Sequence, residues 1–105
     1  MVGDEKKDIR MKIPGKVKIG AFIYTVNFVE GLCSDEHRFA ELFPRKLEIN
    51  IEKALNPQRF FEGLVHEVLE AINCENELNI PHPTIETLGG GITAFLRDNN
   101  FLREV

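Results

Sequence analysis

His66, Glu67 and Glu70 have the residue types and the spacing that metal chemistry requires. If the segment around them is helical, His66 and Glu70 lie one turn apart on the same side of the helix. An imidazole nitrogen and a carboxylate oxygen placed in this way can bind one ion. Glu67 then points to a different side, which suits a base that contacts water rather than the ion.

The segment His66-Glu67-Val68-Leu69-Glu70 is a variant of the His-Glu-x-x-His motif. In that motif both histidines bind zinc, and the glutamate after the first histidine is the general base of a peptidase. Here Glu70 replaces the second histidine, and a carboxylate oxygen binds zinc at about the same distance as an imidazole nitrogen. A solvated polar helix face is the alternative interpretation of this pentapeptide.

His82 is the candidate for a third ligand, because a helical hairpin would bring the start of the next helix back to the first one. Two histidines and one glutamate are a common catalytic zinc set. We therefore expect one Zn²⁺ per chain, bound by His66, Glu70 and His82, with Glu67 as the catalytic base. Glu86 is either a hydrogen-bonding partner of a ligand or a reserve ligand. The alternative for His82 is a helix N-cap or turn residue.

Composition limits the class of protein. The chain has 105 residues, 43% of them hydrophobic, which is enough for one modest core and one domain. We expect a flexible leader at 1–12, where charged residues dominate, and a single domain at 13–105.

The formal net charge is -4 and the basic residues are scattered, so a nucleic-acid partner is not expected. No apolar stretch approaches the roughly 20 residues of a membrane span, and no secretory signal is evident. These features favour a cytoplasmic protein without a membrane partner.

Neither cysteine has a second thiol at metal-ligand spacing. Cys33 and Cys74 are therefore expected to be reduced thiols. His37 has no second metal-binding residue at helical spacing. It is therefore expected at the surface, at the end of a strand.

Alternating apolar residues predict two β-hairpins. Val17 and Ile19 alternate with lysines, Gly20-Ala21 offers a tight turn, and period-two alternation continues to Phe28. A second hairpin pairs the run Phe39–Phe43 with Lys46–Glu52, whose strict alternation places Leu47, Ile49 and Ile51 on one buried face.

Two helices follow. Asn56-Pro57 predicts the start of the first, which ends near Asn76. Its apolar stripe is formed by Phe61, Leu64, Val65, Val68, Leu69 and Ile72. The second begins at Pro83. Gly89-Gly90-Gly91 lies in its middle, where each glycine costs about 1 kcal/mol relative to alanine. Either the helix breaks there or another backbone approaches closely.

The stretch from about Lys16 to Asn99 resembles the small metallopeptidase-like proteins of phages and prophages, which are related to minimal gluzincin-type zinc peptidases. The resemblance rests on Ile19-Gly20 and Tyr24, the strand Lys46–Ile51, the segment Leu64–Ile72 and the ending Phe95–Asn99. Many members have His-Glu-x-x-His with a glutamate at the next helix. The resemblance implies that Glu70 and His82 have exchanged ligand types. A phage-encoded protein would act in the host cytoplasm.

We thus expect an α+β domain with an antiparallel sheet of about four strands followed by two helices, the first carrying the motif. One hypothesis is a zinc metallopeptidase that hydrolyses a peptide or protein substrate laid along a sheet edge. The other is a phage-encoded, metal-stabilised binding or assembly module without turnover. Sequence leaves both open, because none of Tyr24, His37 and the scattered arginines can be assigned to stabilise an oxyanion. It also leaves the oligomeric state undetermined.

Overall fold

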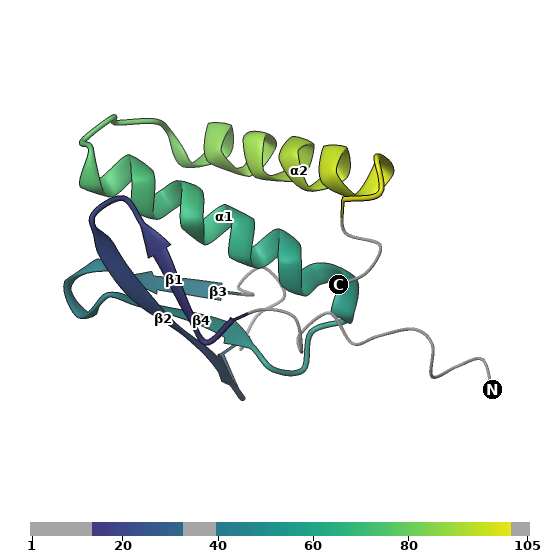
Figure 1. Ribbon diagram of the computed structural model, residues 1–105, viewed down its shortest axis with the longest axis horizontal. Coiled ribbons are helices and arrows are strands. Elements are labelled where there is room, and N and C mark those ends of the chain that lie inside the picture. The colour runs from purple at the N-terminus through teal and green to yellow at the C-terminus, as the bar shows by residue number, and fades with distance from the viewer. Residues whose placement is uncertain (1–13, 33–39, 102–105) are drawn as a thin grey trace.

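The computed structural model describes residues 14–32 and 40–101, without the side chains of residues 57 and 58. The leader expected at 1–12 lies outside these residues, as do Cys33, His37 and Phe39. The elements are β1 (Lys16–Ile19), β2 (Phe22–Val29), β3 (Ala40–Phe43), the 3-10 helix η3 (Pro44–Lys46), β4 (Glu48–Glu52), α1 (Pro57–Glu75) and α2 (His82–Asp98). The chain has the expected α+β fold, a four-stranded sheet followed by two helices (Figure 1).

Both predicted hairpins are present. In the first, Gly20 has a φ of 60°, in the left-handed region that glycine enters at little cost, and Ile19 pairs with Phe22 across the turn. In the second, β3 and β4 pair antiparallel, with Leu42 opposite Ile49.

The second hairpin has a longer turn than its sequence predicts. Pro44 begins η3, and the N–H of Leu47 donates a hydrogen bond to the carbonyl of Pro44 at 3.2 Å. Leu47 is itself left-handed, with a φ of 54°. The return strand therefore begins at Glu48, two residues later than the alternation from Lys46 suggests.

The sheet has the order β1-β2-β4-β3 and is mixed. The two hairpins are antiparallel, as expected, but they meet along a parallel pairing of β2 with β4. Asn27 lies opposite Asn50 in this pairing, and the Asn27 Nδ2 donates a hydrogen bond to the Asn50 Oδ1 at 3.0 Å. Among the described strands, β1 and β3 form the two edges.

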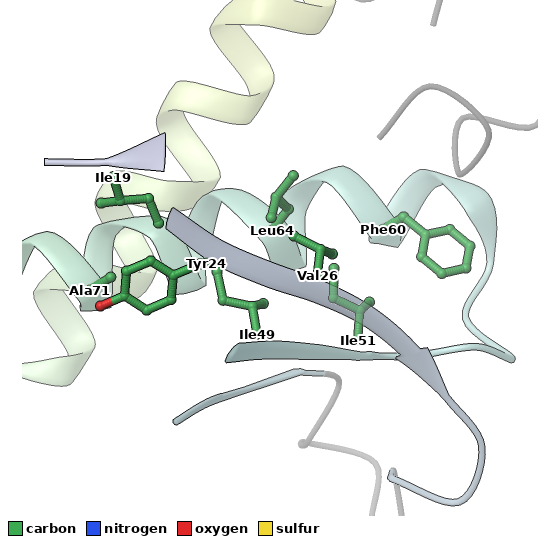
Figure 2. Close-up of a cluster of buried hydrophobic side chains, with 8 residues drawn as sticks. All are labelled: Ile19, Tyr24, Val26, Ile49, Ile51, Phe60, Leu64 and Ala71. Carbon is green, nitrogen blue, oxygen red and sulfur yellow. The ribbon is translucent and has the colours of Figure 1, made fainter. Parts of the chain in front are cut away.

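The hydrophobic core lies between the sheet and α1, as Figure 2 shows. Its buried residues are Ile19, Tyr24, Val26, Ile49, Ile51, Phe60, Leu64 and Ala71. Tyr24 is fully buried, and its hydroxyl donates a hydrogen bond to the Glu75 carboxylate at the end of α1. The predicted burial of Ile49 and Ile51 is confirmed, and Leu47 is partly buried against this core.

The buried face of α1 differs from the predicted stripe. Phe60, Glu67 and Ala71 are buried, whereas Ile72 is 37% exposed. The reason is that α1 is covered on two sides, because it lies between the sheet and α2 (Figure 1). Its apolar residues are divided between two interfaces, so that their periodicity does not describe a single face.

The second helix packs mainly on α1, and it continues without a break through the three glycines. A Cβ built on Gly89 would lie 3.7 Å from the Cα of His66, so Gly89 is the point of close backbone approach that the sequence suggests. Gly90 and Gly91 have no such neighbour within 4 Å. In the described part of the chain, neither helix has the length and apolarity that crossing a membrane would require.

Candidate metal centre

The first helix presents His66 and Glu70 on the side that faces α2. The His66 Nε2 lies 3.5 Å from the Glu70 Oε2, as expected for side chains four positions apart on a helix. Both side chains are mostly buried, at 19% and 23% exposure. Gly89 of α2 lies against this turn of α1, where a Cβ would be in van der Waals contact with the Cα of His66 at 3.7 Å.

The loop between the helices determines where His82 lies. The Asn73 Nδ2 donates to the carbonyl of Ile80 at 3.0 Å, and the N–H of Ile80 donates to the Asn73 Oδ1 at 2.9 Å. The chain enters this loop through Glu77 and Asn79, which have φ values of 51° and 60°. Asn73 thus attaches the residues just before α2 to the same face of α1 that carries His66 and Glu70. This contact joins residues seven positions apart and is not evident from the sequence pattern.

His82 completes a group of three candidate ligands. The His82 Nδ1 lies 2.8 Å from the Glu70 Oε2, and the rings of His66 and His82 meet edge to face with centroids 5.0 Å apart. One ligand atom from each of His66, Glu70 and His82 can be chosen so that all lie within 4.8 Å of one another. The described structure therefore brings together the three residues that the sequence singles out as ligands, and such a group could hold a metal ion.

The donor set fits zinc, and the two separations from Glu70 are close to the spacing that zinc requires, within a group whose ligand atoms all lie within 4.8 Å. A tetrahedral zinc ion with bonds of about 2.0–2.1 Å holds its ligand atoms about 3.3 Å apart. The two distances from the Glu70 Oε2, 2.8 Å and 3.5 Å, lie on either side of this value. The His82 side chain is 61% exposed, so water can reach the open side of the group.

Glu86 lies beside this group rather than within it. The Glu86 Oε2 is 3.6 Å from the His82 Nε2, the ring nitrogen that does not face Glu70. A carboxylate in this position can accept a hydrogen bond from a metal-binding histidine and fix its orientation. Of the two roles considered for Glu86, the geometry favours that of a hydrogen-bonding partner.

The pKa values of the two histidines are shifted in opposite directions. Burial lowers the pKa of His66, against an opposing effect of the Glu70 carboxylate, so His66 favours the neutral form that binds metals. The hydrogen bond with Glu70 raises the pKa of His82. His82 and Glu70 therefore form a charge-assisted pair in the absence of an ion.

Glu67 is not one of the three clustered residues, but it is close enough to Glu70 and His82 for their charges to affect its pKa. It is 7% exposed, and burial, followed by the nearby Glu70 carboxylate, raises its pKa from 4.5 to about 7. The charge of Glu41 on β3 also raises this pKa, an electrostatic interaction between distant parts of the sequence that local spacing does not reveal. A carboxylate with a pKa near neutrality is suited to accept and donate protons.

The other residues considered for chemistry are not part of this group. Tyr24 is fully buried and bonded to Glu75, and burial and this hydrogen bond raise its pKa to about 12. Cys74 is an exposed free thiol. His37 lies outside the described residues.

Comparison of the chain with models of protein families, with curated proteins and with solved structures finds no significant match.

Proposed function

We propose that this chain is a small zinc-binding, metallopeptidase-like domain in which His66, Glu70 and His82 hold one Zn²⁺. The observation that carries the proposal is the convergence of three ligand atoms from two helices within 4.8 Å. The similarity of the motif region to the phage metallopeptidase-like proteins agrees with it. When bound, zinc would supply a Lewis acid that polarises a peptide carbonyl and activates water.

Glu67 is the residue that we assign to proton transfer. It lies on the same turn of α1 as the proposed ligands but is not one of the three clustered residues, and the charges of Glu70 and His82 affect its pKa. Its pKa of about 7 allows it to take a proton from water and return it to the leaving amine near neutral pH. The substrate we propose is a peptide or protein.

The β3 strand is the sheet edge best placed to receive such a peptide. A Cβ on Gly63 of α1 would lie 3.8 Å from the Cβ of Ala40 on β3, and Glu41 is close enough to Glu67 to raise its pKa. An extended peptide added beside β3 would be held by backbone hydrogen bonds, which impose little sequence preference. Cleavage would then show broad specificity.

A second candidate function is a metal-stabilised binding or assembly module without turnover. The observation that favours it is the burial of Tyr24 against Glu75, which removes the described tyrosine as a hydrogen-bond donor to an oxyanion. In this case the ion would stabilise only the packing of α2 on α1.

Metal analysis of protein purified without a chelator or an affinity tag tests the zinc proposal. After reconstitution and removal of excess zinc, elemental analysis should give about one zinc per chain. His66→Ala should abolish binding, because two remaining protein ligands hold zinc too weakly. His37→Ala, which also removes an imidazole, is the matched control and should retain the metal. Metal content near zero in the wild type would refute the proposal.

A further inference from the structure

Thr93 on α2 carries a buried hydroxyl group that the fold does not use. The residue is 3% exposed, and its Oγ1 has no hydrogen-bond partner in the described part of the chain. Thr87, on the same helix, instead donates to the carbonyl of Pro83 at 3.1 Å, the common bond of a helical threonine. Because an unpaired buried hydroxyl destabilises a fold, the position of Thr93 points to a partner that the helix itself does not supply.

His66 has a ring nitrogen of complementary chemistry. Its Nε2 lies 3.5 Å from the Glu70 Oε2 and is the atom placed to bind an ion. A neutral histidine that binds a metal through Nε2 carries its proton on Nδ1. This Nδ1 makes no hydrogen bond within the described part of the chain, although the side chain is only 19% exposed. His66 therefore offers a mostly buried donor that needs an acceptor.

The packing of α2 on α1 brings Thr93 to the side of His66 that carries this donor. The helices run antiparallel, and a Cβ on Gly89 would lie 3.7 Å from the His66 Cα (Figure 1). Gly89 and Thr93 are both buried and lie one helical turn apart, so Thr93 lies over the turn of α1 that precedes His66. Nδ1 and Nε2 lie on different edges of the ring. A ring that turns Nε2 toward Glu70 therefore turns Nδ1 away from Glu70 and toward that preceding turn.

We propose that Thr93 is a positioning residue of the metal centre, whose hydroxyl oxygen accepts a hydrogen bond from the Nδ1–H of His66. This role depends on the proposed zinc site, because the bond holds His66 in the tautomer that leaves Nε2 free for the ion. Partners of this kind fix the tautomer and the ring orientation of a metal-binding histidine. Thr93 then serves the buried His66 with a neutral acceptor, as the exposed Glu86 serves His82 with a charged one.

Glu62 is the competing acceptor, because it lies one turn before His66 on α1 and its charge affects the pKa of His66. Its carboxylate already accepts a hydrogen bond from the Arg59 Nη1 at 3.3 Å, and its side chain is 42% exposed. Water can therefore satisfy Glu62 without His66, whereas the buried hydroxyl of Thr93 has no such access. Thr93 is the acceptor that gains more from the bond.

Thr93→Val and Thr93→Ser test the hydroxyl and the methyl group of Thr93 separately. Valine keeps the shape and removes the hydroxyl, so competitive titration with a chelator should show zinc affinity about tenfold or more below that of the wild type. In EDTA its Tm should equal or exceed the wild-type value, because the hydroxyl that it removes is unpaired. Serine keeps the hydroxyl and loses a buried methyl group, so it should retain zinc affinity and lower the Tm.

Thr87→Val is the matched control, since it makes the same chemical change at an exposed position of α2 and should keep the wild-type zinc affinity. Nuclear magnetic resonance gives a second readout that a purely structural role would not change. In the zinc-loaded wild type, the Nδ1 proton of His66 should give a slowly exchanging signal, which Thr93→Ser keeps and Thr93→Val loses.

The outcomes separate this inference from the zinc proposal. A wild type that binds zinc together with a Thr93→Val protein of equal affinity would overturn the role of Thr93 and leave the metal centre standing. Equal losses of affinity in Thr93→Val and Thr93→Ser would also overturn it, because the hydroxyl would then not be the group that matters. A wild type that binds no zinc would overturn both proposals.

Discussion

At the scale of single residues, one helical turn carries two carboxylates in opposite environments. Glu70 lies between two imidazoles and has a polar environment. Glu67, three positions earlier, is buried, and its pKa rises to about 7. The same turn therefore carries a candidate ligand and a carboxyl group whose raised pKa lets it hold its proton to near neutral pH.

This contrast predicts how metal-free protein responds to pH. A carboxyl group whose pKa rises from 4.5 to about 7 on folding stabilises the fold fully below pH 4.5 and loses this contribution as the pH rises through 7. A shift of this size corresponds to about 3 kcal/mol. Glu67→Gln should remove this dependence, so denaturant unfolding in EDTA should show the variant more stable than wild type at pH 8 but not at pH 4.5.

Glu62→Gln, at a more exposed position of the same helix, is the control and should behave like the wild type. If Glu67 is also the base of a peptidase, the zinc-loaded Glu67→Gln protein should keep its metal and lose peptide cleavage. A Glu67→Gln protein that cleaves peptides as well as the wild type would exclude Glu67 as the base.

The proposed exchange of ligand types between Glu70 and His82 gives a second prediction at this scale. His82→Glu leaves one histidine and two glutamates, a weaker set for zinc. Adding Glu70→His rebuilds His-Glu-x-x-His with a downstream glutamate and should restore affinity. Residues that share one ion couple by roughly 0.5–3 kcal/mol, so competitive zinc titration of the two single variants and the double variant should depart from additivity. Additive effects would show that His82 is not a ligand.

At the scale of elements, the placement of His82 depends on contacts between elements, and Asn73 makes one of them. Its side chain makes two hydrogen bonds to the backbone of Ile80, just before α2 begins. Asn73→Ala should lower the free energy of unfolding by about 1–3 kcal/mol, because both backbone groups of Ile80 lose their partner. It should also weaken zinc binding, because His82 is then less firmly placed.

Asn76→Ala is the matched control for Asn73→Ala. Asn76 is exposed, and its side chain bonds only to the carbonyl of Ile72 in the same helix. The control should therefore change zinc affinity little. Equal losses of zinc affinity in the two variants would contradict the role assigned to Asn73.

Local patterns predicted the elements well, because each depends on neighbouring residues. The Gly20 turn, the Asn56-Pro57 helix start and the start of α2 around Pro83 are of this kind. The parallel pairing of β2 with β4 depends on how two hairpins meet, which alternation within each strand does not encode. The electrostatic effect of Glu41 on Glu67 has the same origin, because it depends on where β3 lies relative to α1.

The sequence likewise predicted one part of the candidate site and not the other. Helical spacing brought His66 and Glu70 together, and the helical hairpin allowed His82 to be proposed. The bonds from Asn73 to Ile80 and the approach of Gly89 to His66 determine whether these side chains meet. These contacts join residues from different elements, and a single sequence gives no direct signal for them.

At the scale of the whole molecule, the candidate ligands join the outermost helix to the rest of the fold. The second helix packs mainly on α1, so bound metal would connect it to the layer beneath (Figure 1). Removing the metal should lower protection against hydrogen exchange in α2 and change it little in β2 and β4. Mass spectrometry of zinc-loaded and chelated protein measures this difference. Equal loss of protection across the sheet would contradict it.

The mixed sheet also has a consequence for the order of folding. Each hairpin joins residues close in sequence and closes a short loop, whereas Asn27 and Asn50 on the parallel seam are 23 positions apart. Loop-closure entropy makes such a seam form later than the hairpins. A slip of one residue at that step would turn Ile49 and Ile51 to the wrong face of the sheet. The hydrogen bond between the two asparagines requires the native register, so it selects that register at the moment when the two halves of the sheet meet.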